Sequence, residues 1–122
     1  MTPQEPLRLT LAPKSTTGFD AYDEQNQKYE IKGRRITRHS KSRQLSAIRG
    51  LNDGHFEFIA GVIFNEDFKV LKACLMPYEI VFELTTYREH VNAWVLHLRD
   101  SVWEKPSVVD ITAAIQAAQM KK

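Results

Sequence analysis

Cysteine is nearly absent from this chain, which has one among its 122 residues and therefore cannot form an internal disulfide. Cys74 stands in the apolar run LKACLMP, and no CxxC or Cys/His spacing accompanies it. The usual zinc sites of small domains are excluded on that ground. We predict that Cys74 is a core residue.

Long apolar runs are also lacking. No uninterrupted stretch approaches the ~18 to 20 apolar residues of a membrane span. The first residues, MTPQEPLRLT, have neither the basic start nor the apolar stretch of a signal peptide. We therefore expect a cytoplasmic protein with no membrane partner. Internal repeats and interior linkers are missing as well, so the sequence predicts a single domain over residues 1–122, with residues 1–6 disordered.

Histidine pairs are the third absence. The four histidines (39, 55, 90 and 97) form no HxH or HxxxH motif, which argues against a zinc site or another metal site built on histidine. We expect the large aromatic side chains of the second half to lie in the core rather than to stack on bases. They are Tyr78, Phe82, Tyr87, Trp94 and Trp103.

Positive charge is concentrated in one segment. Residues 28–49 hold 8 of the 17 Lys and Arg side chains but only 1 of the 15 carboxylates, Glu30. Segregated cations are expected on a surface that binds phosphates, because each neutralised phosphate releases condensed counterion. Five of the eight are arginines, whose planar fork suits phosphate oxygens. The alternative is a solvated surface with no ligand.

Alternation and helical periodicity predict an α+β (mixed α/β) domain. Strands are expected at 7–12, 56–64, 68–76 and 92–99, and a β-hairpin is expected from 18–24 and 27–36. Helices are expected at 42–50, ending at Gly50, at 77–85, beginning with Pro77, and at 111–120, capped by Asp110. We expect Arg99, near the end of the strand at 92–99, to pair with a carboxylate.

The hairpin carries the chemically informative residues. In its second strand Glu30 and Lys32 point to one face, the less apolar one, while Tyr29 and Ile31 point to the other. Asp20 comes from the first strand. If the connecting loop has an odd number of residues, Asp20 falls opposite Glu30 or Lys32 and the three side chains converge. A two-residue loop would place Asp20 opposite Ile31.

Two carboxylates and a lysine at one point suit metal-assisted phosphodiester hydrolysis. Carboxylate oxygens suit Mg²⁺, with Mn²⁺ as a substitute, and the bound ion would polarise phosphorus and acidify a water. Asp20 and Glu30 would be ligands, with the backbone carbonyl of Ile31 as a third. Lys32 would orient or deprotonate the water and offset charge on the phosphate.

The sequence resembles the PD-(D/E)XK nuclease superfamily, the restriction-endonuclease-like fold. The resemblance rests on the pattern Phe19-Asp20, then nine residues, then Glu30-Ile31-Lys32. The chain also resembles a small prokaryotic branch of this superfamily, in the runs TTGFDAY and YEIKGRR followed by RQLSAIRG. This similarity extends from about residue 11 to residue 115. The resemblance implies a central mixed β-sheet whose hairpin carries the site, flanking helices, and Mg²⁺-dependent cleavage of DNA by Asp20, Glu30 and Lys32.

The chain departs from the family before its first core strand. Members usually carry a helix there, but residues 1–18 contain three prolines and no amphipathic stretch. The resemblance therefore implies a truncated form, or a partner chain that covers the exposed face of the sheet. A homodimer is the expected assembly, because it would place two sites on two DNA strands.

Other residues are assigned to DNA by their position. We expect phosphate or supporting contacts from Arg34, Arg35, Arg38, Lys41, Arg43 and Gln44. Asp67-Phe68-Lys69, with Asp53 upstream, also fits the nuclease pattern, but it lies on a turn without flanking cations. Two alternatives remain open: a catalytically inactive nucleic-acid-binding subunit of the same fold, and a plain structural or interaction module.

Overall fold

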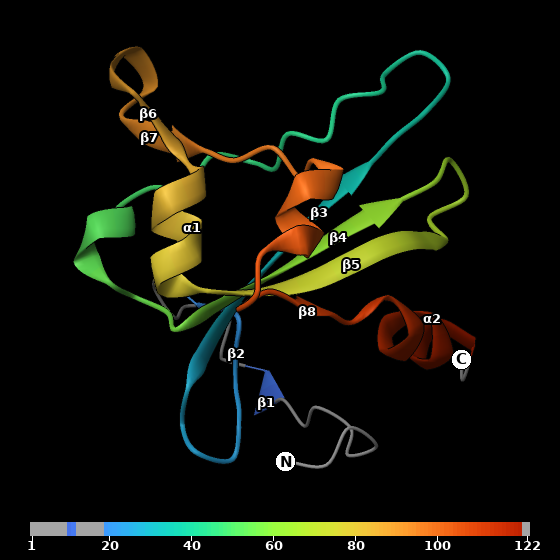
Figure 1. Ribbon diagram of the computed structural model, residues 1–122, viewed down its shortest axis with the longest axis horizontal. Coiled ribbons are helices and arrows are strands. Elements are labelled where there is room, and N and C mark those ends of the chain that lie inside the picture. Colours follow the sequence, from blue (N-terminus) through green and yellow to red (C-terminus); the bar gives the residue numbers. More distant parts are fainter. Residues whose placement is uncertain (1–9, 12–18, 121–122) are drawn as a thin grey trace.

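The structure is a computed structural model that describes residues 10–11 and 19–120 (Figure 1). The prediction of disorder for residues 1–6 and most of the strand predicted at 7–12 lie outside these residues. The described residues form a mixed α+β fold with a six-stranded sheet in the order β1-β2-β3-β4-β5-β8 and a separate two-stranded sheet, β6-β7. The strands of the large sheet are Thr10–Leu11, Ala21–Tyr22, Lys28–Arg35, Phe58–Phe64, Val70–Pro77 and Val109–Asp110.

The smaller elements lie around this sheet. Strands β6 and β7 are Thr86–Arg88 and Ala93–Val95, and the α-helices α1 and α2 are Tyr78–Leu84 and Thr112–Met120. Three short 3-10 helices are η1 at Leu51–Asp53, η2 at Glu89–Val91 and η3 at Asp100–Glu104. Among the described residues, neither α-helix has the length and apolar character needed to cross a membrane.

The sheet is mixed because β3 and β4 are parallel while the other neighbours are antiparallel. Five consecutive residues of β4 are buried, from Ile59 to Ile63, as expected for a central strand covered on both faces. The predictions of the central strand, its antiparallel partner and the hairpin that precedes them are confirmed. In this parallel ladder Glu30 pairs with Ile59, and Arg34 pairs with Ile63. Paired residues of neighbouring strands point to the same face, so Glu30 and Arg34 share a face with two core residues of β4.

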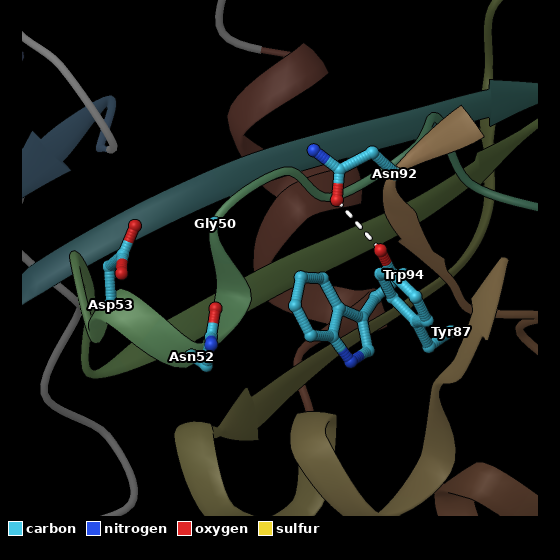
Figure 2. A pocket seen from close by; sticks show the side chains of 6 residues that line it. All are labelled: Gly50, Asn52, Asp53, Tyr87, Asn92 and Trp94. Atoms are coloured by element: carbon cyan, nitrogen blue, oxygen red, sulfur yellow. Dashed lines mark hydrogen bonds between the residues drawn. The ribbon is translucent and has the colours of Figure 1, made fainter. Parts of the chain in front are cut away.

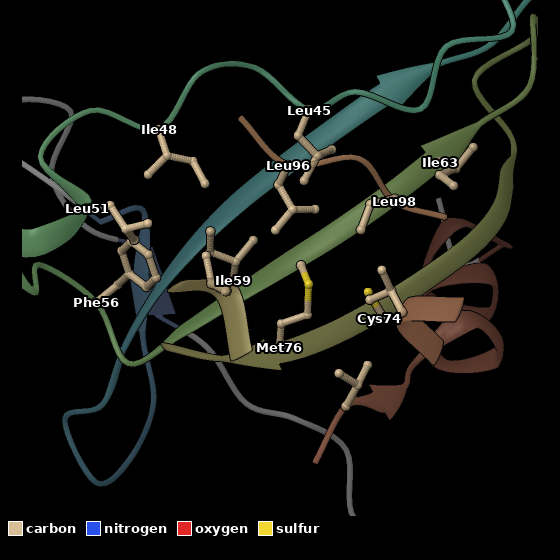
Figure 3. Close-up of a cluster of buried hydrophobic side chains, with 13 residues drawn as sticks. Leu45, Ile48, Leu51, Phe56, Ile59, Ile63, Cys74, Met76, Leu96 and Leu98 are labelled. Atoms are coloured by element: carbon tan, nitrogen blue, oxygen red, sulfur yellow. The ribbon is translucent and has the colours of Figure 1, made fainter. Parts of the chain in front are cut away.

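The main hydrophobic core lies on that face (Figure 3). Its side chains come from β4, β5 and α1, and from the segments at 45–56, 96–98 and 102–108. Cys74 is fully buried in this core, as predicted. A smaller cluster on the opposite face joins Val62 and Ala73 to Ile111 and Ile115, where α2 packs against β5.

The helix predicted at 42–50 is wrong. Leu45 and Ile48 are buried at a spacing that suits a helix, but the segment is extended. The Leu45 amide donates to Leu96 O at 2.9 Å, and the amide of Ile48 donates to Trp94 O at 2.9 Å. The main-chain partner at 94–98 therefore overrides local helical periodicity, as tertiary contacts commonly do.

Other boundaries differ from the predictions in smaller ways. Helix α1 is confirmed. Pro77, predicted as its first residue, is instead the N-cap that precedes it. Asp110 accepts a hydrogen bond from the Thr112 amide at 2.9 Å and caps α2, as predicted. The strand predicted at 92–99 is regular only over Ala93–Val95.

Candidate active site

The hairpin between β2 and β3 satisfies the register condition for convergence. Tyr22 pairs with Lys28, so the loop consists of five residues, 23–27, an odd number. Asp23 organises this loop, because its carboxylate accepts hydrogen bonds from the Gln27 amide at 2.9 Å and from the Tyr29 hydroxyl at 2.8 Å. The paired register ends at Ala21 with Tyr29, one residue short of Asp20, and the charge of Asp20 lies near enough to Glu30 to raise the pKa of that residue.

Glu30 and Lys32 form an ion pair on β3, with Nζ and Oε1 3.6 Å apart. The Lys32 side chain is only 10% exposed and that of Glu30 is 23% exposed. The Lys32 ammonium also donates to Ser46 Oγ at 2.9 Å and to Ala47 O at 3.4 Å. The segment after β3 therefore folds back over this pair and encloses the amine.

The enclosure differs from the prediction about the two faces of β3. Glu30 and Lys32 were expected on the less apolar face, but they share the face of the main core, which includes Leu45 and Ile48. Ile31 on the other face is 43% exposed. The extended path of residues 44–51 causes this inversion, because it covers the face that the charged residues occupy.

Asp20 contacts β3 through the main chain. Its Oδ2 accepts a hydrogen bond from the Ile31 amide at 2.7 Å, and its own amide donates to Tyr29 O at 2.8 Å. In a strand the N–H and C=O of one residue point toward the same neighbouring strand. The Ile31 carbonyl therefore points to the side on which Asp20 lies, as its predicted role as a ligand requires.

The electrostatics of Glu30 are dominated by burial. Desolvation raises the pKa of Glu30, the Lys32 ammonium opposes this shift, and the charge of Asp20 raises the pKa further. His55 is near enough to lower the pKa slightly. A raised pKa means that the charge of Glu30 is incompletely balanced, and a divalent cation between the two carboxylates would relieve that imbalance.

These groups fit a hard cation in donor type. Carboxylate and carbonyl oxygens with added waters are the ligand set that Mg²⁺ prefers. Among residues 10–11 and 19–120, however, no group of three or more His, Cys, Asp and Glu side chains is placed to hold a metal ion. Any ion at this point would therefore depend on Asp20, Glu30, the Ile31 carbonyl and water.

The basic segment lies along β3 and the loop that follows it, which extends past the end of the sheet (Figure 1). Thr37 and Ser40 close a tight turn in this loop, and Arg38 and Lys41 are exposed there. Arg34 points its guanidinium toward Ser40 Oγ at 3.4 Å. At about 3.3 Å per residue, this turn is about 20 Å or more along the strand from Glu30.

Three other arginines of the segment bind main-chain or acidic groups of the chain itself. Arg35 donates to Glu66 O at 3.2 Å and lies over the Phe68 ring. Arg49 donates to Val91 O at 2.8 Å. Arg43 pairs with Asp100 at 2.6 Å. These contacts fix the segment to the fold, and a phosphate would have to share or replace them.

Asp100 joins two cations rather than the predicted Arg99. Lys72 lies 3.0 Å from the same carboxylate oxygen as Arg43, and hydrogen bonds from both cations lower the pKa of Asp100. Arg99 forms no ion pair within the described part of the chain, so that prediction is wrong. Gln44, which lies in the helix predicted at 42–50, instead forms a β-bridge to His97.

The aromatic residues divide into two groups. Tyr78, Trp94 and Trp103 are partly buried and pack against the main core, as predicted. Phe82 and Tyr87 are 47% and 45% exposed, so the core assignment is wrong for them. The second nuclease-like pattern, Asp67-Phe68-Lys69, lies in a turn where Asn65 Oδ1 accepts from the amides of Asp67 and Lys69.

Sequence reasoning missed a pocket next to η1. It has a volume of about 440 Å³ (Figure 2). Its lining residues are Gly50, Asn52, Asp53, Tyr87, Asn92 and Trp94. The small polar cluster Gly50 to Gly54 was a detectable turn signal, but its partner wall on the β6-β7 hairpin comes from distant residues.

No family model matches this chain, and no curated protein matches it either.

Proposed function

We propose that the chain is a Mg²⁺-dependent endonuclease of restriction-endonuclease-like fold that hydrolyses DNA phosphodiester bonds. The observation that carries this proposal is the enclosed Glu30–Lys32 pair at 3.6 Å, with Asp20 held on the adjacent Ile31 amide at 2.7 Å. A hairpin that carries the site and is followed by a parallel strand is compatible with the proposed fold.

Each side chain has a distinct task in this proposal. Asp20, Glu30 and the Ile31 carbonyl would hold the cation, which when bound polarises the scissile phosphate and acidifies a water. Lys32 is fixed by Ser46 and Glu30, so its ammonium is positioned to orient the attacking water and offset the charge that develops on phosphorus. The enclosure of the amine strengthens this electrostatic effect because little water screens it.

DNA would be held by the exposed cations beyond the end of β3. Arg38 and Lys41 are exposed at the turn, and Arg34 and Arg35 lie on the strand that leads to it. Phosphate contacts of this kind position a duplex without reading its sequence. Arg43 and Gln44 remain proposed DNA contacts. A homodimer would supply a second site for the second strand, and the proposal includes it.

Incubation of supercoiled plasmid with Mg²⁺ tests the proposal. Wild type should produce nicked and linear DNA, chelation should stop the reaction, and Lys32→Met should lower the rate by about a hundredfold or more. Lys41→Met is the matched control, since it removes an exposed lysine of the same basic segment. The Lys41→Met variant should still cleave the plasmid, at a reduced rate. Equal rates for wild type and Lys32→Met would contradict the proposal.

One observation favours a second function, a nucleic-acid-binding subunit without catalysis. The Lys32 ammonium already has three partners, Glu30, Ser46 and Ala47, as in a structural ion pair. This function predicts DNA binding that depends on salt, is indifferent to divalent metal and to Glu30→Ala, and is accompanied by no cleavage.

A further inference from the structure

The pocket beside η1 has one aromatic wall and one polar wall (Figure 2). The aromatic wall consists of Trp94 and Tyr87, whose ring centroids are 4.8 Å apart at an interplanar angle of 56°. The Tyr87 hydroxyl donates to Asn92 Oδ1 at 2.8 Å. The polar wall consists of Asn52 and Asp53 on η1.

Trp94 is the anchored part of the aromatic wall. The main chain of Trp94 exchanges two hydrogen bonds with Ile48, at 2.8 and 2.9 Å, and Ile48 is itself buried. Trp94 also packs against the main core. A flat ring held in this way offers a stacking surface that loses little conformational entropy when a ligand binds.

The polar wall offers acceptors. The Asp53 side chain is 63% exposed, its Oδ2 lies 3.6 Å from His55 Nε2, and its carboxylate is an acceptor only. Gly50 supports this position, because a Cβ there would lie 2.8 Å from Asp53 Oδ2. A carboxylate repels phosphate but accepts hydrogen bonds from the amino and ring N–H groups of bases.

The pocket adjoins the candidate active site through one short segment. Lys32 donates to Ala47 O, and the next residue, Ile48, pairs with Trp94. On the other side of η1, His55 contacts Asp53 and lies near enough to influence Glu30. The segment at 47–48 and the Asp53–His55 pair therefore link the pocket to the candidate active site.

We infer that this pocket binds an unpaired nucleobase with an exocyclic amino group, stacked on Trp94 with its amino group toward Asp53. The inference rests on the proposed function for the identity of the polymer. Bases within a duplex cannot reach such a pocket, whereas splayed or single-stranded bases stack readily on aromatic side chains. The preferred substrate is therefore DNA with unpaired nucleotides beside the cleavage point, such as a flap, a gap or the locally opened duplex of a supercoiled plasmid.

Binding measurements in EDTA test this inference without reference to cleavage. Fluorescence anisotropy should show tighter binding of a labelled single-stranded 12-mer than of the blunt duplex of the same sequence. Trp94→Ala should weaken single-strand binding about tenfold, as loss of one stacked base does. Phe82→Ala is the control, because Phe82 is an exposed aromatic residue that lies on α1 outside the pocket.

Two further readouts keep the test decisive if Trp94→Ala folds poorly. The chain has two tryptophans, and the Trp103 indole donates to Ala73 O inside the fold. A single-stranded oligonucleotide should shift the indole N–H resonance of Trp94 and leave that of Trp103 unmoved. Asp53→Asn should reduce the preference for cytosine or adenine runs over thymine runs, because an amide also offers donors.

The outcomes separate the two claims. Equal affinity for single strand and duplex, an unmoved Trp94 resonance, or a shift caused only by a neutral oligosaccharide would overturn the inference. A chain that cleaves plasmid but shows no Trp94 response retains the proposed function and loses the inference. A chain that binds single strands through Trp94 but never cleaves loses the proposed function and keeps the pocket.

Discussion

The Asp20 carboxylate accepts a hydrogen bond from the Ile31 amide at 2.7 Å, so one side chain both fastens its own segment to β3 and lies near enough to Glu30 for its charge to raise the pKa of that residue. This dual use makes two substitutions separable. Asp20→Asn keeps an oxygen acceptor for the amide, whereas Asp20→Ala leaves that amide without this acceptor.

We expect Asp20→Asn to abolish cleavage while changing the free energy of unfolding little. Asp20→Ala should abolish cleavage and also lower the free energy of unfolding by about 1 kcal/mol. Plasmid cleavage and urea denaturation of the two variants measure both effects. Full cleavage by Asp20→Asn would show that the residue serves the hairpin alone.

Glu30 should make stability depend on pH with a definite sign. Because burial raises the pKa of Glu30, the folded chain retains a proton that the unfolded chain has released. The contribution of Glu30 to stability therefore declines as pH rises from the ordinary glutamate range through the raised pKa. Glu30→Gln removes this penalty.

We therefore expect Glu30→Gln to be more stable than wild type above the raised pKa and equal to it at acid pH, below the ordinary glutamate pKa. Its cleavage rate should fall about a hundredfold or more, because a metal ligand is lost. Thermal denaturation across pH in EDTA gives the first result. A variant less stable than wild type at neutral pH would contradict the electrostatic account.

Two glycines form a matched pair for testing the pocket. Gly50 and Gly54 both have positive φ, 63° and 66°, so alanine at either position should cost about 1 kcal/mol in the free energy of unfolding. A Cβ at Gly50 would meet Asp53 Oδ2 at 2.8 Å, whereas a Cβ at Gly54 would have no neighbour within 4 Å.

Only Gly50→Ala should therefore displace Asp53 and weaken the binding of single-stranded DNA. The affinity should fall roughly tenfold, the loss expected when one hydrogen bond to a charged group is removed. Anisotropy measurements on the two variants at equal folded fraction test this. Equal loss of binding in both would mean that backbone strain, rather than the Asp53 carboxylate, sets the affinity.

The thiol of Cys74 reports on the main core. It is fully buried, and burial raises its pKa to about 12, so little thiolate exists at neutral pH. Native protein should react with an aromatic disulfide reagent at least about a thousandfold more slowly than urea-unfolded protein, because reaction requires opening of the core. Rapid reaction of the native chain would show that this face of the sheet opens locally.

The positions of the strands could be predicted wherever the local pattern and the tertiary environment agree. The continuous apolar run at 56–64 became the central strand, and the alternation at 27–36 became the strand of the candidate site. The odd-loop condition was also stated from sequence and met. The length of the loop itself, residues 23–27, depends on Asp23 accepting the Gln27 amide and the Tyr29 hydroxyl, which no periodicity reveals.

The wrong helix at 42–50, the unexpected enclosure of Lys32 and the missed pocket have one common cause, the pairing of residues 43–48 with 94–98. This long-range contact replaced the helix predicted at 42–50 and enclosed Lys32. It also built the pocket by bringing Trp94 beside η1. Sequence patterns report on neighbours along the chain, so contacts some 50 residues apart lie beyond them.

The central claim is that Asp20 and Glu30 share one divalent cation beside Lys32. Mn²⁺ binding, followed by electron paramagnetic resonance as free Mn²⁺ disappears, measures this directly. The account predicts one ion per chain, displaced by Mg²⁺ and lost in both Asp20→Asn and Glu30→Gln, with Asp53→Asn unchanged. Absence of bound Mn²⁺ in wild type, or Mn²⁺ binding in either carboxylate variant equal to that of wild type, would contradict it.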